Sequence, residues 1–409
     1  MKDINPPRVR DTCVWFLEHA TFQKWKASST VDLLWLSADP GCGKSVLSRA
    51  LIDEKELLSA EPVTLCYFFF KDNSEQNNNT TALCALLHQF FCAHESLLQK
   101  YAAKAERQNG LALKNDFDGL WKIFTSAATD PLAGEVICIL DALDECQESD
   151  RNILIHHVQR FYEEFTEREV RGFKLKFLMT SRPYSDIEYQ FSILLQRIPT
   201  IRLAGEEESE KISREIGIFM AAKVNEIADR RRLGNNVRES LLKRLAGVEN
   251  RTYLWLHLTL DQVKTLEGKT LKKWLEAIDT LPQTVEEAYE KILARCNRQN
   301  ARTALRIIVA AQRPLTLREI DVALAITKES TSCEDLDLEG DTGRREWVRN
   351  SCGLFVSIVD SRVFLIHQTA REFLLRKNEH NGLIPGAWKH SISLREAHRN
   401  LSEICITYL

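Results

Sequence analysis

The sequence lacks a hydrophobic run long enough to cross a bilayer. No uninterrupted apolar stretch in its 409 residues approaches the roughly 18 residues that a membrane-spanning helix needs. Residues 1–7 also lack the apolar segment that is typical of a secretion signal. From these absences we expect a soluble protein of the cytoplasm that has no membrane partner.

Paired cysteines are missing as well. The 11 cysteines are an odd number and include no Cys-x-x-Cys pair, so the pattern predicts neither a disulfide framework nor a zinc site. Several lie within apolar or motif segments, where a reduced cysteine behaves as a small hydrophobe. These are Cys42, Cys66, Cys84, Cys138 and Cys352. We therefore expect a reducing compartment.

Neither charge is in excess. Lys and Arg total 55 against 58 Asp and Glu, and the net charge of -3 gives no electrostatic reason to expect nucleic acid as a partner. Hydrophobic residues make up 44% and charged residues 28%, which is ordinary globular composition. The length allows two or three domains. No repeat of about 20–50 residues is present, which excludes ankyrin, TPR and WD40 arrays.

Short apolar runs alternate with amphipathic segments in the first half of the chain. This alternation is typical of a parallel sheet with helices on both faces. The runs are residues 33–37, 63–70, 136–140, 175–180 and 200–203. A helical pattern at residues 12–25 precedes them, and the polar residues 73–80 read as a loop. We predict a lead-in helix within residues 1–30 and an α/β domain over residues 31–204.

Helical patterns replace the strand signals after residue 204. Charged and aliphatic residues alternate at helical spacing through residues 206–281, which predicts a helical domain over 205–281. Pro282 marks its end, because proline disfavours helical geometry in the residue before it.

Three helices and a hairpin are expected next. The helical stretches are residues 284–296, 301–311 and 316–326, and two apolar runs, 354–359 and 363–366, flank a turn at 360–362. This order predicts a winged-helix domain over residues 282–376. A further helical segment begins within residues 377–409.

The first apolar run leads directly into a phosphate-binding loop. Residues 38–45 read Ala-Asp-Pro-Gly-Cys-Gly-Lys-Ser between a predicted strand and a predicted helix, which is the context that such a loop requires. The glycines allow backbone amides to surround the β-phosphate, Lys44 supplies charge to the β- and γ-phosphates, and the Ser45 hydroxyl binds Mg²⁺. The predicted nucleotide-binding residues of the loop are Pro40, Gly41, Cys42, Gly43, Lys44, Ser45 and Val46.

One position departs from the usual pattern of this loop. Ala38 stands where glycine is usual, and its extra methyl group requires only a mild local adjustment. The alternative is a fortuitous turn beside a core strand, and the strand–helix context argues against it.

Three acids follow the apolar run at residues 136–140. Buried strands of open α/β sheets deliver such side chains to the crevice where ligands bind. Asp141 suits Mg²⁺, and either Asp144 or Glu145 could deprotonate the attacking water. The phosphate loop lies 96 residues upstream, counted from Ser45 to Asp141. This pairing favours a catalytic role over a solvated acidic loop, and we expect two more strands within the gap to supply an added central strand.

Arg182 and His367 each have two interpretations. Arg182 follows the run at 175–180 and could report a γ-phosphate, as a cis arginine does in other nucleotide hydrolases; the alternative is a surface arginine before Pro183. His367 follows the predicted hairpin. A histidine in that place is more often a hydrogen-bonded structural residue than a ligand, so the residues alone favour the structural role.

Taken together, these motifs resemble the NACHT-type signal-transduction NTPases (STAND proteins), and most of all the nephrocystin-like NACHT proteins of filamentous fungi. The resemblance spans nearly the whole chain. It rests on residues 12–15 and 22–25, the phosphate loop, and residues 141–145, 180–183, 253–256 and 367–374.

The resemblance implies a slow P-loop nucleoside triphosphatase that acts as a signalling switch with ATP, or GTP, and Mg²⁺. It implies a closed state with ADP, in which His367 touches the β-phosphate, and an open state with ATP that self-associates. Relatives of this kind carry an effector domain before this core and a repeat sensor after it, and we expect neither in this sequence.

Three other functions remain as alternatives. A scaffold could bind nucleotide without hydrolysing it, and measured turnover separates it from a switch. A metabolic kinase would need a lid over an acceptor site and gains nothing from a winged helix. A DNA-binding regulator is disfavoured, because the helical stretch at 316–326 carries one basic and two acidic side chains.

Overall fold

The computed structural model divides into two compact units, Met1–Phe219 and Met220–Leu409, and each is described by itself. It describes residues 2, 5–54, 57, 62–103, 107, 110–167, 173–192, 200–203, 206–248, 251–265, 271–326, 336–375 and 388–408. The predicted domain boundaries after residues 204 and 376 fall outside these described residues. The predicted boundaries after residues 30 and 281 lie within the described residues, but nothing in the structure tests them, so all four stay predictions.

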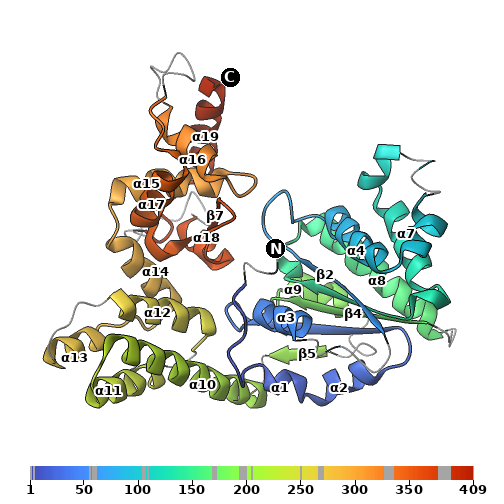
Figure 1. Cartoon of the computed structure of the whole chain (residues 1–409), viewed down its shortest axis with the longest axis horizontal. Coiled ribbons are helices and arrows are strands. Elements are labelled where there is room, and N and C mark those ends of the chain that lie inside the picture. The colour runs from blue at the N-terminus through green and yellow to red at the C-terminus, as the bar shows by residue number, and fades with distance from the viewer. Residues whose placement is uncertain are drawn as a thin grey trace. The chain divides into compact units, whose positions relative to one another are not determined.

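The first unit is built on a five-stranded parallel sheet (Figure 1) with the strand order β2-β3-β4-β1-β5. The strands are β1 (Asp32–Ala38), β2 (Val63–Phe69), β3 (Glu135–Asp141), β4 (Lys174–Ser181) and β5 (Thr200–Leu203). Each of the five predicted apolar runs forms one of them. Every residue of β3 is buried, which explains its continuous apolar sequence, since a central parallel strand is covered on both faces.

The expectation of two strands between the phosphate loop and the acidic motif is wrong. Apart from β3, which ends in the acidic motif, the described part of that gap holds one strand, β2, and β4 is the added central strand. It follows the acidic motif in the sequence but pairs with β1 on one side and β3 on the other. Parallel strands are joined by crossovers, so their order in the chain does not give their order in the sheet. The end of β4 therefore lies between the ends of β1 and β3.

Helices cover the sheet of the first unit. Helix α2 contacts β1 and β5, and α3 contacts β3. Helix α4 contacts β2 and also packs against the helices α7 and α8. The helices are α1 (Val14–Leu17), α2 (Ala20–Ala27), α3 (Lys44–Asp53), α4 (Asn79–Ala93), α5 (Glu95–Leu97), α7 (Phe117–Ala128), α8 (Glu148–Glu167) and α9 (Ser185–Ser192). Side chains of α4, α7 and α8 and of strands β1 to β4 share one apolar core.

Two helical boundaries differ from the prediction. The single lead-in helix expected at residues 12–25 is two short helices, because His19 has extended backbone (φ -65, ψ 127) and its side chain accepts a hydrogen bond from the Thr21 amide to start α2. The polar loop expected at 73–80 is shorter, since Asn78 caps α4 by accepting a hydrogen bond from the Thr81 amide at 2.8 Å.

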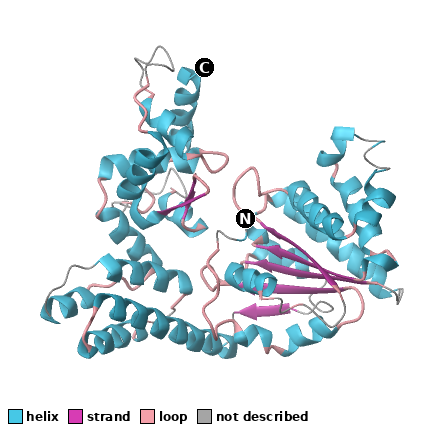
Figure 2. Cartoon of the chain, in the orientation of Figure 1, coloured by secondary structure: helices cyan, strands magenta, loops and turns pink. Residues whose placement is uncertain are grey.

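Among its described residues, the second unit has helices and one two-stranded hairpin (Figure 2). Its first helix, α10 (Glu206–Arg231), begins in the first unit and is continuous across the division. The others are α11 (Asn235–Ala246), α12 (Tyr253–Thr265), α13 (Leu271–Asp279), α14 (Val285–Ala294), α15 (Arg298–Ala310), α16 (Leu317–Ala325), α17 (Gly340–Cys352), α18 (Gln368–Leu374) and α19 (Leu394–Tyr408). Helices α14, α15 and α16 match the three predicted stretches.

The predicted hairpin is confirmed as β6 (Val356–Val359) and β7 (Arg362–Leu365), which pair antiparallel. Asp360 and Ser361 both have positive φ (47° and 59°), the pattern of a two-residue type I′ turn. The turn is one residue shorter than predicted, because Arg362 belongs to β7.

Within the described ranges, no helix is both long enough and apolar enough to cross a membrane.

Candidate functional site

The phosphate loop leads from β1 into α3 as the sequence predicts. Gly41 and Gly43 have φ of 78° and 88°, in the left-handed region where glycine is favoured, and Gly43 immediately precedes the helix. Ala38, the departure from the usual pattern, is the last residue of β1 and is buried there beside Leu203. Its methyl group is therefore accommodated within a strand rather than within the turn.

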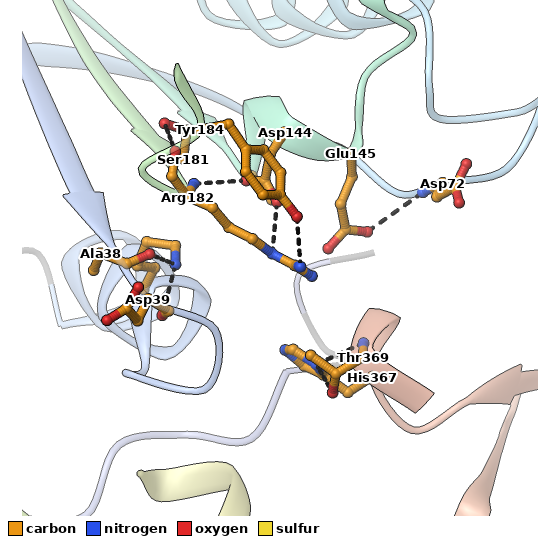
Figure 3. Close-up of polar contacts among 12 residues, drawn as sticks. Ala38, Asp39, Asp72, Asp144, Glu145, Ser181, Arg182, Tyr184, His367 and Thr369 are labelled. Carbon is orange, nitrogen blue, oxygen red and sulfur yellow. Dashed lines mark hydrogen bonds and ion pairs between the residues drawn. The ribbon is translucent and has the colours of Figure 1, made fainter. Parts of the chain in front are cut away.

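Lys44 folds back over this loop, and Figure 3 labels Ala38 and Asp39, whose carbonyl oxygens it contacts. Its Nζ donates to the carbonyl oxygen of Ala38 at 2.5 Å and to that of Asp39 at 3.1 Å. Burial lowers the pKa of the Lys44 ammonium, and the nearby carboxylates of Asp144 and Asp141 oppose that shift. The ammonium thus lies at the start of α3, where the helix dipole and the first backbone amides also favour an anion.

Asp141 ends β3 and is held by hydroxyl groups from two neighbouring elements. Its Oδ1 accepts hydrogen bonds from Ser48 Oγ of α3 at 2.7 Å and from Thr180 Oγ1 of β4 at 2.8 Å. Its Oδ2 is buried and has no hydrogen-bond partner among the residues that the structure describes. A fixed carboxylate with one uncommitted oxygen fits a hard divalent cation such as Mg²⁺.

The donor set around Asp141 is small. The described part of the chain contains no group of three or more His, Cys, Asp and Glu side chains that could hold a metal ion. Mg²⁺ at phosphate sites is commonly bound through one or two protein oxygens together with phosphate oxygens and water. The residues therefore fit a nucleotide-dependent Mg²⁺, with Ser45 and Asp141 as the predicted ligands.

Asp144 and Arg182 form a buried ion pair (Figure 3). The Arg182 Nε lies 2.9 Å from Asp144 Oδ2, and the Arg182 backbone amide donates to Oδ1 at 3.0 Å. The exposed fractions of the two side chains are only 6% for Arg182 and 4% for Asp144. Arg182 is therefore not a surface arginine. Both oxygens of Asp144 are engaged by Arg182, which makes Asp144 the weaker candidate for a base.

Tyr184 gives the same guanidinium a further contact. Its hydroxyl accepts a hydrogen bond from Arg182 Nη1 at 2.9 Å, and its ring centroid lies 5.8 Å from the guanidinium carbon. Arg182, which the sequence predicts to be a γ-phosphate sensor, is thus held between a carboxylate and a tyrosine.

Glu145 is the stronger candidate for a general base. It ends a short 3-10 turn, Leu143–Glu145, and its Oε2 accepts a hydrogen bond from the Asp72 amide at 3.3 Å. Burial raises the pKa of the Glu145 carboxyl, the Lys71 ammonium lowers it, and the Asp144 carboxylate raises it. A carboxyl whose pKa is raised above its ordinary range is better matched to proton transfer at neutral pH.

The backbone at the tip of β3 is strained. Ala142 has a φ of 58°, which is unusual for a residue with a side chain, and its amide donates to Thr180 Oγ1 at 2.9 Å. Such conformations persist where the surrounding structure fixes them, and here Thr180 also holds Asp141.

Sequence reasoning missed several residues of this site. Four further residues contact the predicted ones, but their side chains are of types too common to indicate a site from sequence alone. They are Ser48, Lys71, Thr180 and Tyr184. The one available signal was position, because Lys71 and Thr180 stand at or next to the carboxyl ends of apolar runs.

His367 belongs to the second unit, where it starts α18. Its Nδ1 accepts a hydrogen bond from the Thr369 amide at 3.2 Å and lies 2.9 Å from Thr369 Oγ1 (Figure 3). That hydroxyl is in turn 2.9 Å from the hydroxyl of Tyr289. The structural role expected from the residues alone is therefore present. The ligand role implied by the resemblance stays a prediction.

Three protein-family models match consecutive parts of the chain. Residues 11–182 match the N-terminal part of nephrocystin 3, residues 212–278 match a domain of unknown function (DUF7069), and residues 289–383 match the winged-helix domain of GPI inositol-deacylase. The winged helix predicted from the sequence thus has an independent match.

One relative matches most of this chain. It is the vegetative incompatibility protein HET-E-1 of Podospora anserina, which is 26% identical over 378 residues, or 90% of this chain. The matched region is 26% of that protein, so the chain spans about a quarter of the relative's length.

Distant likeness to solved structures is also found. The Aeropyrum pernix ORC2 protein in ADPNP–ADP complexes is 12% identical with a TM-score of 0.35, covering 98% of this chain and 95% of that one. The protein CDC6P from Pyrobaculum aerophilum is 12% identical with a TM-score of 0.34, covering 98% and 96%. No functional conclusion rests on likenesses of this size.

Proposed function

We propose that this chain, a NACHT-like protein of the nephrocystin type, is a nucleotide-driven signalling switch that binds ATP with Mg²⁺ and hydrolyses it slowly. In the proposed cycle, the ADP-bound form is closed and the ATP-bound form is open and self-associates. A nucleotide can drive such a cycle only if it binds one form better than the other. GTP would serve the same phosphate contacts.

One observation carries this proposal. Three groups stand at the carboxyl edge of one parallel sheet: the lysine of the phosphate loop, the carboxylate of Asp141 that two hydroxyls hold, and the partly buried carboxyl of Glu145. In open α/β sheets that edge is where ligands bind. A cation for phosphates, an oxygen for Mg²⁺ and a base for water are the parts that nucleotide hydrolysis needs.

Each residue then has a stated task. Backbone amides at the start of α3 and the Lys44 ammonium bind the β- and γ-phosphates. Ser45 and Asp141 would hold Mg²⁺, which neutralises phosphate charge when it is bound. Glu145 takes one proton from the attacking water as the water oxygen bonds to the γ-phosphorus. The bond from that phosphorus to the bridging oxygen breaks, its electron pair stays with ADP, and the proton passes from Glu145 to solvent.

A scaffold that binds nucleotide without hydrolysing it is the second candidate. The state of Arg182 favours it, because this arginine is paired with Asp144 and Tyr184 in the described residues. An arginine held in this way is less available to stabilise charge on a transferring phosphoryl group.

Single-turnover hydrolysis separates the two candidates. Purified protein is loaded with radiolabelled ATP and Mg²⁺, freed of excess nucleotide, and quenched over minutes to hours. The switch predicts conversion of bound ATP to ADP in the parent, with no conversion in Glu145→Gln. If the bound ATP stays unhydrolysed in the parent over several hours, the switch is excluded and the non-hydrolysing scaffold is the function that fits.

The biological setting is proposed from the relative. HET-E-1 is named a vegetative incompatibility protein, and we propose self/non-self or cell-death signalling for this chain as well. We further propose a cytoplasmic location, as the cysteine pattern predicts. Its partners would be the nucleotide and further copies of the same chain.

A further inference from the structure

The segment that leaves β2 contacts Glu145 at two points. The Asp72 amide donates to Glu145 Oε2 at 3.3 Å, and the Lys71 Nζ lies 3.9 Å from Oε1 (Figure 3 shows the Asp72 contact). No role is predicted for residues 71 and 72, which lie between the apolar run at 63–70 and the polar loop at 73–80. We propose that Lys71, together with the Asp72 amide, is the positioning element of Glu145: the amide fixes one carboxylate oxygen and the ammonium holds the other. This inference rests on the proposed function, since it takes Glu145 to be the general base of hydrolysis.

The segment is well placed for this task because it is anchored at both ends. Next to β2, the Phe70 amide donates to the Asp141 carbonyl oxygen at 3.0 Å. At the other end, the Gln147 amide donates to the Asn77 carbonyl oxygen at 2.7 Å. Both anchors tie the segment to the chain that carries the acidic motif. Lys71 and Glu145 therefore keep their separation without depending on a long flexible connection.

Gln76 closes the segment on itself. Its side-chain amide donates to the Phe69 carbonyl oxygen at 3.1 Å, and its own carbonyl oxygen accepts a hydrogen bond from the Lys71 amide at 3.3 Å. The side chain of Gln76 is buried. The two residues that touch Glu145 thus stand at the start of a closed turn rather than on a loose loop.

The charges around Glu145 show what Lys71 contributes. The charged groups that face the Glu145 carboxyl are Lys71, Asp144, Arg182 and Asp141. Arg182 is already paired with Asp144, so Lys71 is the cation in this group whose ion pair is with Glu145 itself. Without Lys71, Glu145 would face two carboxylates and one cation, Arg182, whose charge is largely offset by its pairing with Asp144.

The sign of the effect follows from these charges. Burial and Asp144 favour the protonated form of Glu145, and Lys71 favours the carboxylate, which is the form that accepts a proton from water. Removing the Lys71 charge should therefore raise the pKa of Glu145 further. Hydrolysis would then be lost first at the acidic end of the pH range.

The test compares single-turnover hydrolysis of bound ATP from pH 5 to 9 in the parent, Lys71→Met and Lys71→Arg. Methionine keeps length and apolar contact but removes charge, and arginine keeps the charge. We expect the acid limb of the Lys71→Met profile to move up by about one unit, a roughly tenfold lower rate below the limb. Lys71→Arg should restore the parent profile. Affinity for ATP–Mg²⁺ should stay within about threefold in both variants.

Lys122→Met is the matched control, because Lys122 is an exposed lysine of α7. It should keep the parent profile. A merely structural Lys71 would lower the melting temperature and reduce the rate equally at every pH, and that result overturns the inference. If Lys71→Met does not fold, Lys71→Gln gives the same comparison.

Glu145→Gln keeps the two proposals distinguishable. If it abolishes hydrolysis while Lys71→Met leaves the acid limb unmoved, only the positioning role fails. If Glu145→Gln hydrolyses ATP at the parent rate, the base itself is wrong and the proposed function fails with it.

Discussion

At the scale of single residues, Lys44 is the side-chain cation of the phosphate loop. Its ammonium reaches the loop carbonyl oxygens of Ala38 and Asp39, and burial lowers its pKa. Lys44→Ala should lower ATP–Mg²⁺ affinity by tenfold or more, since a hydrogen bond to a charged group contributes about 1.5–3 kcal/mol. Equilibrium titration with a fluorescent ATP analogue measures this, with Lys122→Ala as the exposed-lysine control. An affinity within about threefold of the parent would refute the loop assignment.

Asp144 and Glu145 should respond differently to neutralisation. Glu145→Gln should reduce hydrolysis by roughly 10²–10⁴-fold, the usual contribution of a general base, while binding persists. Asp144→Asn breaks a buried pair and should lower stability by about 3–5 kcal/mol in urea unfolding, with a much smaller loss of turnover among the molecules that stay folded. A larger loss of turnover in Asp144→Asn than in Glu145→Gln would mean that Asp144 is the general base.

His367 is a structural cap in the described residues, and its ligand role is proposed from the resemblance alone. His367→Asn keeps a side chain that can cap α18 and removes the imidazole. If His367 serves the diphosphate state, this variant should weaken ADP binding about ten- to a hundredfold more than ATP binding. Isothermal titration with both nucleotides gives the ratio. Equal changes for ADP and ATP, with a lower melting temperature, would leave His367 a cap only.

The sequence predicted the site residues better than it predicted their partners. A phosphate loop has a fixed spacing of glycine, lysine and serine, so Lys44 and Ser45 can be read directly from the chain. The Asp144–Arg182 pair joins residues 38 positions apart and depends on the insertion of β4 beside β3. Lys71 and Glu145 are 74 positions apart in the sequence (145 minus 71). Such contacts depend on strand order, which local sequence does not encode.

At the scale of elements, continuous apolar runs and turn residues were the reliable signals. All five strands of the large sheet and the β6–β7 hairpin lie where the pattern predicts them. Helix α17 was missed because most of its residues are polar, and its burial includes Arg344, which pairs with the buried Asp321 of α16. A helix that buries a paired charge lacks the apolar stripe from which amphipathic helices are recognised.

The lead-in helices are fastened to α10 by one carboxylate. Glu215 accepts hydrogen bonds from the amides of Cys13 at 2.5 Å and Trp15 at 3.0 Å, and it is buried. Glu215→Ala would leave these amides without an acceptor, at about 1–3 kcal/mol each. We expect the lead-in segment to loosen while the sheet stays folded.

Thiol alkylation of Cys13 reports that loosening. Burial, with a contribution from Glu215, raises the pKa of the Cys13 thiol to about 12, so the native thiol should react slowly at pH 8. Glu215→Ala should accelerate its alkylation at least tenfold, as followed by mass spectrometry of the Cys13 peptide. Cys405, which is exposed, is the internal control and should react alike in both proteins. An unchanged Cys13 rate would mean that Glu215 does not secure the lead-in segment.

At the scale of the whole molecule, the proposed switch predicts an assembly state that depends on nucleotide. The protein with ADP should sediment as a monomer, and Glu145→Gln with ATP–Mg²⁺ should form larger species, because it binds the triphosphate and cannot consume it. Lys44→Ala should stay monomeric with either nucleotide. Analytical ultracentrifugation at matched concentrations measures all three. Identical sedimentation with ADP and ATP would remove self-association from the proposal.

The nucleotide carried by the purified protein reports whether the phosphate loop binds a nucleotide. The protein is denatured, and the supernatant is separated by ion-exchange chromatography against ATP, ADP, GTP and GDP standards. We expect close to one adenine or guanine nucleotide per chain in the parent, mostly as the diphosphate, and little or none in Lys44→Ala. A parent protein that carries no nucleotide and fails to take up added ATP–Mg²⁺ would contradict this expectation.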